Sequence, residues 1–173
     1  FISFVSYPEI QDQLIICRSF SKEYAMTGWR VGFACARAEI ITEMLKIHDA
    51  AVICAPTISQ YAAYIAMTEK PLADDVNLVQ ALTERRNIMC ARLDKLDDLF
   101  DYAKPYGAYY ILARYKKTKL AAKNFAVKML NEAKVIVIPG TDFGPQAQGC
   151  VRFSFGASTD QINEAFDRLE QWN

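Results

Sequence analysis

The chain has 173 residues, of which 52% are apolar, so it is long enough to form a sizeable hydrophobic core. Twenty basic and twenty acidic residues cancel, and this neutrality argues against a nucleic-acid or acidic-membrane partner. No apolar run approaches the roughly 20 residues that a membrane-spanning helix requires, so we expect no membrane association.

The spacing of the five cysteines matches no zinc or redox motif, and we expect no metal site. We interpret these cysteines as free, buried side chains that pack as small hydrophobes, which is typical of a reducing compartment such as the cytoplasm. The single histidine, His48, gives little support to a Ser-His-Asp hydrolase.

The chain begins at Phe1 within an apolar stretch, and we interpret it as a piece of a longer polypeptide. Apolar runs at residues 14–17 and 31–36 predict two short buried strands. The polar segment at residues 18–30 lies between them.

Helices are predicted next. Residues 39–48 carry apolar side chains at helical spacing, and a second helix begins near Pro56 with Thr57 or Ser59 as its cap. No glycine or proline interrupts residues 72–99, which predicts one long helix starting at Pro71. Because a helix of that length can connect two domains, we place the domain boundary within it, giving domains 1–85 and 86–173.

The second domain is predicted to be α+β, with three strands and helices on one side of them. The strand-type segments are residues 107–112, 135–138 and 151–155. Residues 121–133 are amphipathic, and Ser158 or Thr159 is expected to cap a final helix.

The polar segment after the first strand lies where α/β folds place their ligand sites. Ser19 and Ser21 would share a face if the strand continued, and Gly28 permits an unusual backbone angle. Arg30 immediately precedes the second strand. Two hydroxyls and a guanidinium can converge on one phosphate, with Lys22 beside them as an amine for Schiff-base chemistry.

Residues 19–32 read Ser-Phe-Ser-Lys-Glu-Tyr-Ala-Met-Thr-Gly-Trp-Arg-Val-Gly. This segment resembles the cofactor-lysine signature of the fold type I pyridoxal-phosphate (PLP) enzymes, in the class I/II aminotransferase family. It looks especially like the prokaryotic-type aspartate and aromatic aminotransferases. The resemblance implies that Lys22 binds PLP as a Schiff base and moves the proton between the substrate Cα and the cofactor C4′. It also implies that Ser19 and Arg30 bind the cofactor phosphate, with Ser21 adding a hydroxyl.

A second match lies downstream. Residues 150–156 resemble the family's small-domain strand, whose arginine, here Arg152, binds the substrate α-carboxylate by planar bidentate pairing. Residues 105–110 and the Pro-Gly and Phe-Gly pairs at 139–144 also resemble family segments, which we interpret as architectural. The implied fold is the C-terminal part of the PLP-dependent transferase fold, namely the end of the large mixed-sheet domain plus a small α+β domain, in a homodimer.

Several cofactor contacts of the family precede the lysine by more residues than this chain contains. They are an aspartate on the pyridine nitrogen, a stacked aromatic ring, an asparagine and a tyrosine on the hydroxyl, and a glycine-rich phosphate loop. We therefore expect the 173-residue piece alone neither to retain PLP nor to transaminate.

The resemblance implies transfer of an amino group from an amino acid to a 2-oxo acid. The same signature also occurs in C–S lyases and cyclopropane-forming synthases of this fold, and in the ligand-sensing domain of some transcription regulators. These alternatives stay open, and the substrate side chain is not specified, because family specificity comes from loops and from the neighbouring subunit.

Overall fold

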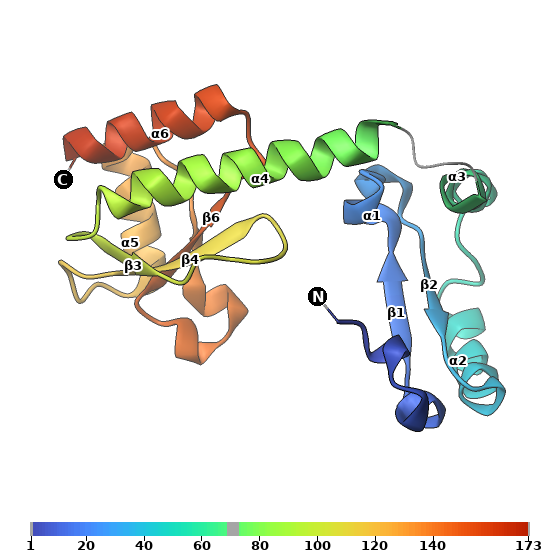
Figure 1. Ribbon diagram of the computed structural model, residues 1–173. Helices are drawn as coiled ribbons and strands as arrows, with labels where there is room; N and C mark the ends of the chain where they lie inside the picture. The colour runs from blue at the N-terminus through green and yellow to red at the C-terminus, as the bar shows by residue number, and fades with distance from the viewer. Residues whose placement is uncertain (1, 69–72, 173) are drawn as a thin grey trace. The chain divides into compact units, whose positions relative to one another are not determined.

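The computed structural model describes residues 2–68 and 73–172 (Figure 1). The chain divides into two compact units, residues 1–76 and 77–173. The division falls within helix α4 (Ala73–Asp94), earlier than the position after residue 85 that we expected. Each unit has its own strands and its own core.

Unit 1 contains an antiparallel pair of strands, β1 (Ile16–Ser19) and β2 (Gly32–Cys35), preceded by the 3-10 turns η1 (Phe4–Ser6) and η2 (Pro8–Gln13). Both strands overlap the apolar runs that predicted them, but the expectation that they are buried was wrong, since no residue of either strand is buried. Gly32 is required for close approach of the strands, since a Cβ there would lie 2.5 Å from the carbonyl oxygen of Arg18.

Two helices follow in unit 1, α2 (Ala38–Ala51) and α3 (Thr57–Thr68). The predicted cap of α3 was wrong. The Pro56 carbonyl accepts a hydrogen bond from the Gln60 N–H at 3.1 Å, so Pro56 occupies the capping position and Ser59 lies buried in the first turn.

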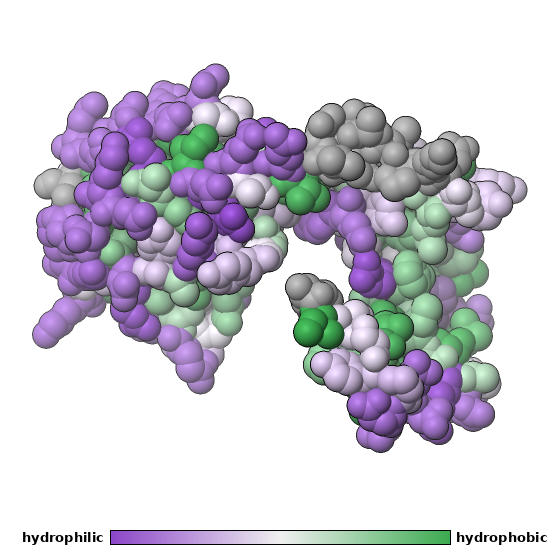
Figure 2. Space-filling view, viewed as in Figure 1, coloured by the Kyte–Doolittle hydropathy of each residue, from purple (hydrophilic) through white to green (hydrophobic). Residues whose placement is uncertain are grey.

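Unit 1 buries few of its apolar side chains. Its core cluster consists of Phe20, Met26 and Ala63 with partly buried neighbours. Large apolar residues such as Phe4 and Ile53 are exposed, and Figure 2 shows such residues gathered on this unit. Exposed apolar surface of this kind is typical of a contact surface.

Unit 2 is built on a four-stranded antiparallel sheet in the order β3-β4-β6-β5. Its strands are β3 (Phe100–Tyr102), β4 (Tyr110–Tyr115), β5 (Ile138–Pro139) and β6 (Cys150–Ser154). The sequence predicted three strands, and β3 is the one it missed. The predicted long helix ends at Asp94 instead of Leu99, because the chain turns through residues 95–99 to enter β3.

Helices cover one face of this sheet, as expected. They are α4, α5 (Ala122–Lys128) with its π-helical continuation η4 (Met129–Ala133), and α6 (Thr159–Trp172). Alternate residues of β4, such as Ile111 and Ala113, join the helices' apolar side chains in one core. The 3-10 turns η5 (Gly140–Phe143) and η6 (Pro145–Ala147) lead into β6.

Ser158 caps α6, which decides between the two predicted caps. The Ser158 Oγ accepts from the Gln161 N–H at 3.3 Å, and the Gln161 Oε1 accepts from the Ser158 N–H at 3.2 Å. This reciprocal capping box satisfies two N–H groups at the helix start.

The cysteines differ from the prediction. Cys90 and Cys150 are buried, but Cys17, Cys35 and Cys54 are exposed, and all five are free. Within residues 2–68 and 73–172, no helix is long and apolar enough to cross a membrane. The same residues contain no group of side chains suited to hold a metal ion.

Candidate active site

The segment between β1 and β2 is a closed loop. Ser19 pairs with Gly32 at the end of the ladder, and the Phe20 N–H donates to the Val31 carbonyl at 3.3 Å. The loop contains the short helix α1 (Phe20–Glu23) and the 3-10 turn η3 (Thr27–Trp29). The ladder therefore gathers the four predicted cofactor residues on one compact loop.

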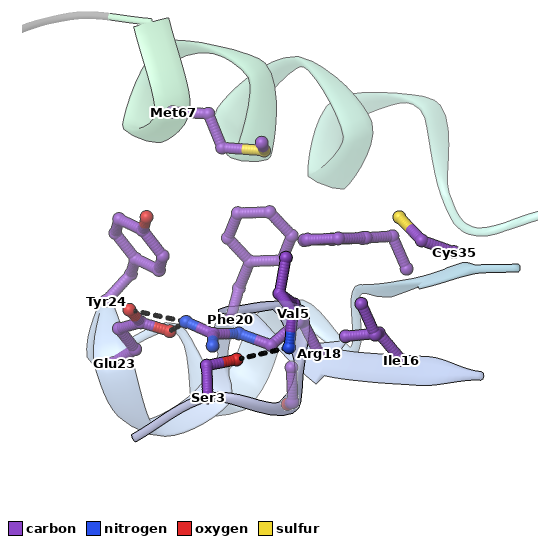
Figure 3. A pocket seen from close by; sticks show the side chains of 11 residues that line it. Ser3, Val5, Ile16, Arg18, Phe20, Glu23, Tyr24, Cys35 and Met67 are labelled. Carbon is purple, nitrogen blue, oxygen red and sulfur yellow. Dashed lines mark hydrogen bonds and ion pairs between the residues drawn. The ribbon is translucent and has the colours of Figure 1, made fainter. Parts of the chain in front are cut away.

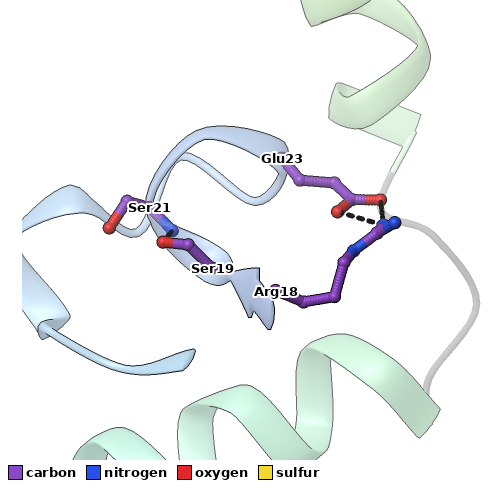
Figure 4. A network of polar contacts seen from close by, with 4 residues as sticks. All are labelled: Arg18, Ser19, Ser21 and Glu23. Atoms are coloured by element: carbon purple, nitrogen blue, oxygen red, sulfur yellow. Dashed lines mark hydrogen bonds and ion pairs between the residues drawn. The ribbon is translucent and has the colours of Figure 1, made fainter. Parts of the chain in front are cut away.

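Ser19 ends the strand and begins α1. Its Oγ accepts a hydrogen bond from the Ser21 N–H at 3.2 Å (Figure 4). The strand does not continue, so Ser19 and Ser21 do not share a strand face as the sequence had suggested. Because a hydroxyl has one donor and two acceptor positions, the Ser19 O–H can still donate to a ligand.

Ser21 and Lys22 differ in exposure. Ser21 is buried, and its carbonyl oxygen accepts a hydrogen bond from the Thr27 hydroxyl at 2.8 Å. Lys22 is exposed on α1. The backbone of Ser21 thus holds the turn that presents the lysine.

Arg30 has a left-handed backbone, with φ 51° and ψ 49°. This conformation costs a residue with a Cβ about 1–2 kcal/mol. Ala25 is also left-handed, with φ 54°. We predicted the unusual backbone angle at Gly28, but it occurs at these two residues instead. The Arg30 Nη1 donates to the Thr27 carbonyl oxygen at 3.0 Å, which directs the side chain back over the turn.

A cavity of about 320 Å³ lies beside this loop, and Figure 3 shows Met67 of α3 extending toward it. Of the predicted cofactor residues, Ser19 lines this cavity. Arg18 and Glu23 also line it and form an ion pair in which the Arg18 Nη2 donates to both carboxylate oxygens of Glu23, at 2.9 and 2.7 Å (Figure 4). The sequence reasoning missed this pair, which ties β1 to the end of α1 beside Lys22.

Arg152 lies on β6 in unit 2, opposite Leu112 of β4 and Ile138 of β5. Its guanidinium carbon is 4.0 Å from the ring centroid of Tyr110 and 4.5 Å from that of Phe143. Its Nε is buried and has no hydrogen-bond partner among the described residues. A buried donor without a partner is costly unless a ligand supplies the acceptor.

The aromatic neighbours of Arg152 come from two sequence motifs whose interpretation changes. We expected the segments containing Tyr110 and Phe143 to be architectural, but their rings contact this guanidinium. Stacking uses the faces of the guanidinium, so its in-plane N–H groups remain suited to a carboxylate. The period-2 pattern of each segment could assign Tyr110 and Arg152 to one face of their strands. It could not predict that the two strands pair with each other.

The residues of the closed loop fit PLP. A serine hydroxyl and an arginine with its unusual backbone can bind a phosphate, and an exposed lysine can react with an aldehyde. Gly32 allows β1 and β2 to approach closely, and it pairs with Ser19. Ser19 therefore lies opposite a residue only two positions after Arg30.

Comparison with known proteins gives a consistent result. The model of the family "Aminotransferase class I and II" matches residues 3–169. An aspartate aminotransferase of Pyrococcus abyssi is 37% identical over 98% of this chain and 43% of its own length. An aromatic-amino-acid aminotransferase of Thermococcus litoralis is 36% identical over 98% of this chain and 43% of its own length.

Solved structures agree in fold. The crystal structure of an aromatic aminotransferase from Pyrococcus horikoshii is similar with a TM-score of 0.91 and 34% identity, covering 98% of this chain and 45% of that one. The predicted fold, the C-terminal part of the PLP-dependent transferase fold, is therefore confirmed. The chain spans less than half the length of the relatives it matches.

Proposed function

Because the chain belongs to the class I and II aminotransferase family, we propose that the whole protein is a PLP-dependent aminotransferase that transfers an amino group from an amino acid to a 2-oxo acid. The observation that carries this proposal is the closed loop at residues 19–32, in which the β1–β2 ladder brings a serine, a lysine and an arginine onto one short segment.

On this proposal each loop residue has a role. Bound PLP supplies an electron sink for the substrate Cα. The Ser19 hydroxyl and the Arg30 guanidinium bind its phosphate, and Ser21, which is buried, holds the turn through its backbone. The Lys22 Nζ would hold the cofactor through its aldehyde, and the same amine would serve as the general base for the proton on the substrate Cα.

Arg152 is proposed to bind the substrate α-carboxylate. Its buried Nε lacks a partner among the described residues, and the two aromatic rings restrain its guanidinium. A restrained planar fork loses less entropy when a carboxylate binds than a flexible lysine would.

Removing one of these rings is expected to weaken substrate binding. A cation–π contact contributes about 0.5–2 kcal/mol, so Tyr110→Leu should raise the amino-acid KM by about 2- to 30-fold. Steady-state kinetics of the whole protein measure this. Tyr106→Leu is the matched control, because Tyr106 is a nearby tyrosine whose side chain is 93% exposed. An unchanged KM in Tyr110→Leu would show that the ring does not orient Arg152.

The reaction itself is tested by product analysis. The whole protein with PLP, an amino acid and 2-oxoglutarate should form glutamate and the matching 2-oxo acid. Pyruvate and ammonia from a cysteine-type substrate would favour a C–S lyase of the same fold instead. No turnover of any amino acid would favour a ligand sensor.

The 173-residue chain alone is the comparison sample. We expect it to form no product, because unit 1 leaves much apolar surface exposed and the chain spans less than half of its relatives. Robust turnover by the chain alone would contradict this expectation.

A further inference from the structure

Thr27 forms hydrogen bonds with residues near both ends of the closed loop at residues 19–32. Its hydroxyl donates to the carbonyl oxygen of Ser21 at 2.8 Å, and its own carbonyl oxygen accepts from the Arg30 Nη1 at 3.0 Å. Ser21 immediately precedes Lys22 in the chain. One residue therefore links the turn that carries the lysine with the guanidinium of Arg30.

The backbone around Thr27 depends on such contacts. Thr27 begins the 3-10 turn η3, and Arg30 ends it in the left-handed conformation. The Trp29 N–H donates to the Met26 carbonyl at 3.1 Å and closes this turn. A left-handed residue with a Cβ persists only where the surrounding contacts hold it.

We propose that Thr27 is a positioning residue that sets the Arg30 guanidinium for the cofactor phosphate. The hydroxyl anchors Thr27 to the Ser21 carbonyl, and this anchor fixes the Thr27 carbonyl that accepts from Arg30. Arg30 then approaches the phosphate with part of its side-chain freedom already lost, which lowers the entropic cost of binding. This inference rests on the proposed function, because it takes PLP as the ligand of the loop.

Comparing the binding of PLP and pyridoxal distinguishes this role from a general effect of Thr27 on the loop. PLP carries the phosphate, whereas pyridoxal has the same ring and aldehyde without it. If Thr27 acts through Arg30, removing its hydroxyl weakens PLP binding and leaves pyridoxal binding unchanged. If Thr27 only supports the Lys22 turn, both ligands lose affinity alike.

The experiment measures the dissociation constants of both ligands by absorbance titration of the whole protein. Thr27→Val removes the hydroxyl and keeps the shape, Thr27→Ala removes the same hydroxyl, and Thr27→Ser retains it. We expect Thr27→Val and Thr27→Ala to weaken PLP binding about three- to tenfold, the range for one hydrogen bond. Pyridoxal binding should stay within about twofold, and Thr27→Ser should match the wild type.

A double-mutant cycle checks the route through Arg30. In an Arg30→Lys background, Thr27→Val should cause no further loss of PLP affinity, because the contact it supports is already absent. Equal losses for PLP and pyridoxal, or no loss in Thr27→Val, would overturn the proposal. Failure of the wild-type protein to bind either ligand would instead reject the proposed function. If the wild-type protein binds both ligands, the affinities of the Thr27 variants decide the role of Thr27.

Discussion

Replacing Lys22 with alanine is expected to abolish covalent attachment of PLP and to remove nearly all transaminase activity. The side chain is exposed on the loop closed by the β1–β2 ladder, so its removal should not unfold the site. Loss of a general acid–base catalyst alone costs about 10²–10⁴ in rate. Borohydride reduction of the whole protein with PLP, followed by peptide mass spectrometry, should find the pyridoxyl group on Lys22 in the wild type and on no lysine in the variant.

Lys46→Ala is the matched control for this experiment. Lys46 also lies in unit 1 on a helix, is exposed, and pairs with Glu43 at 2.6 Å. It should leave both the trapped adduct and the turnover unchanged. Trapping of the cofactor on a different lysine in the wild-type protein would remove Lys22 from its proposed role.

Replacing Arg152 with glutamine is expected to impair amino-acid substrates selectively. Two charge-assisted hydrogen bonds contribute about 3 kcal/mol together, so kcat/KM should fall about 100-fold, mainly through KM. Cofactor binding should not change, because the proposed phosphate ligands all lie on the loop at residues 19–32. Arg152→Lys should recover only part of the loss, since an ammonium lacks the planar fork.

A carboxylate-free substrate makes this test specific. A primary amine that lacks the α-carboxylate should react with Arg152→Gln and with the wild type at similar rates. Arg114→Lys is the matched control, because Arg114 is an exposed arginine on the neighbouring strand β4. An equal loss for the amine and the amino acid would mean that Arg152 supports the fold and does not bind the carboxylate.

The features that the sequence predicted well depend on nearby residues. The strands flanking the loop and the helices at 39–48 and 121–133 follow from hydrophobic patterns. Ser158 was predicted as one of two caps, and the capping box it forms involves a residue only three positions away. The candidate cofactor residues also lie within a single short segment, so the sequence could identify them together.

The features that the sequence predicted poorly depend on pairing between segments that are distant in the chain. Strand β3 is short and forms only by pairing with β4, so no local sequence pattern predicts it. The same holds for β5 (Ile138–Pro139), which shares only Ile138 with the strand predicted at 135–138, because its place is set by pairing with Arg152 and Val151 of β6.

The sequence by itself identified the family, the candidate cofactor residues within 19–32, and Arg152 as the candidate carboxylate ligand to test. Only the tertiary structure decided that the unusual backbone falls on Arg30, that Thr27 links it to the lysine turn, and that Tyr110 and Phe143 contact Arg152. The physical reason is that residue types and spacing encode local chemistry, whereas a side chain's neighbours are set by packing between segments that are remote in the chain.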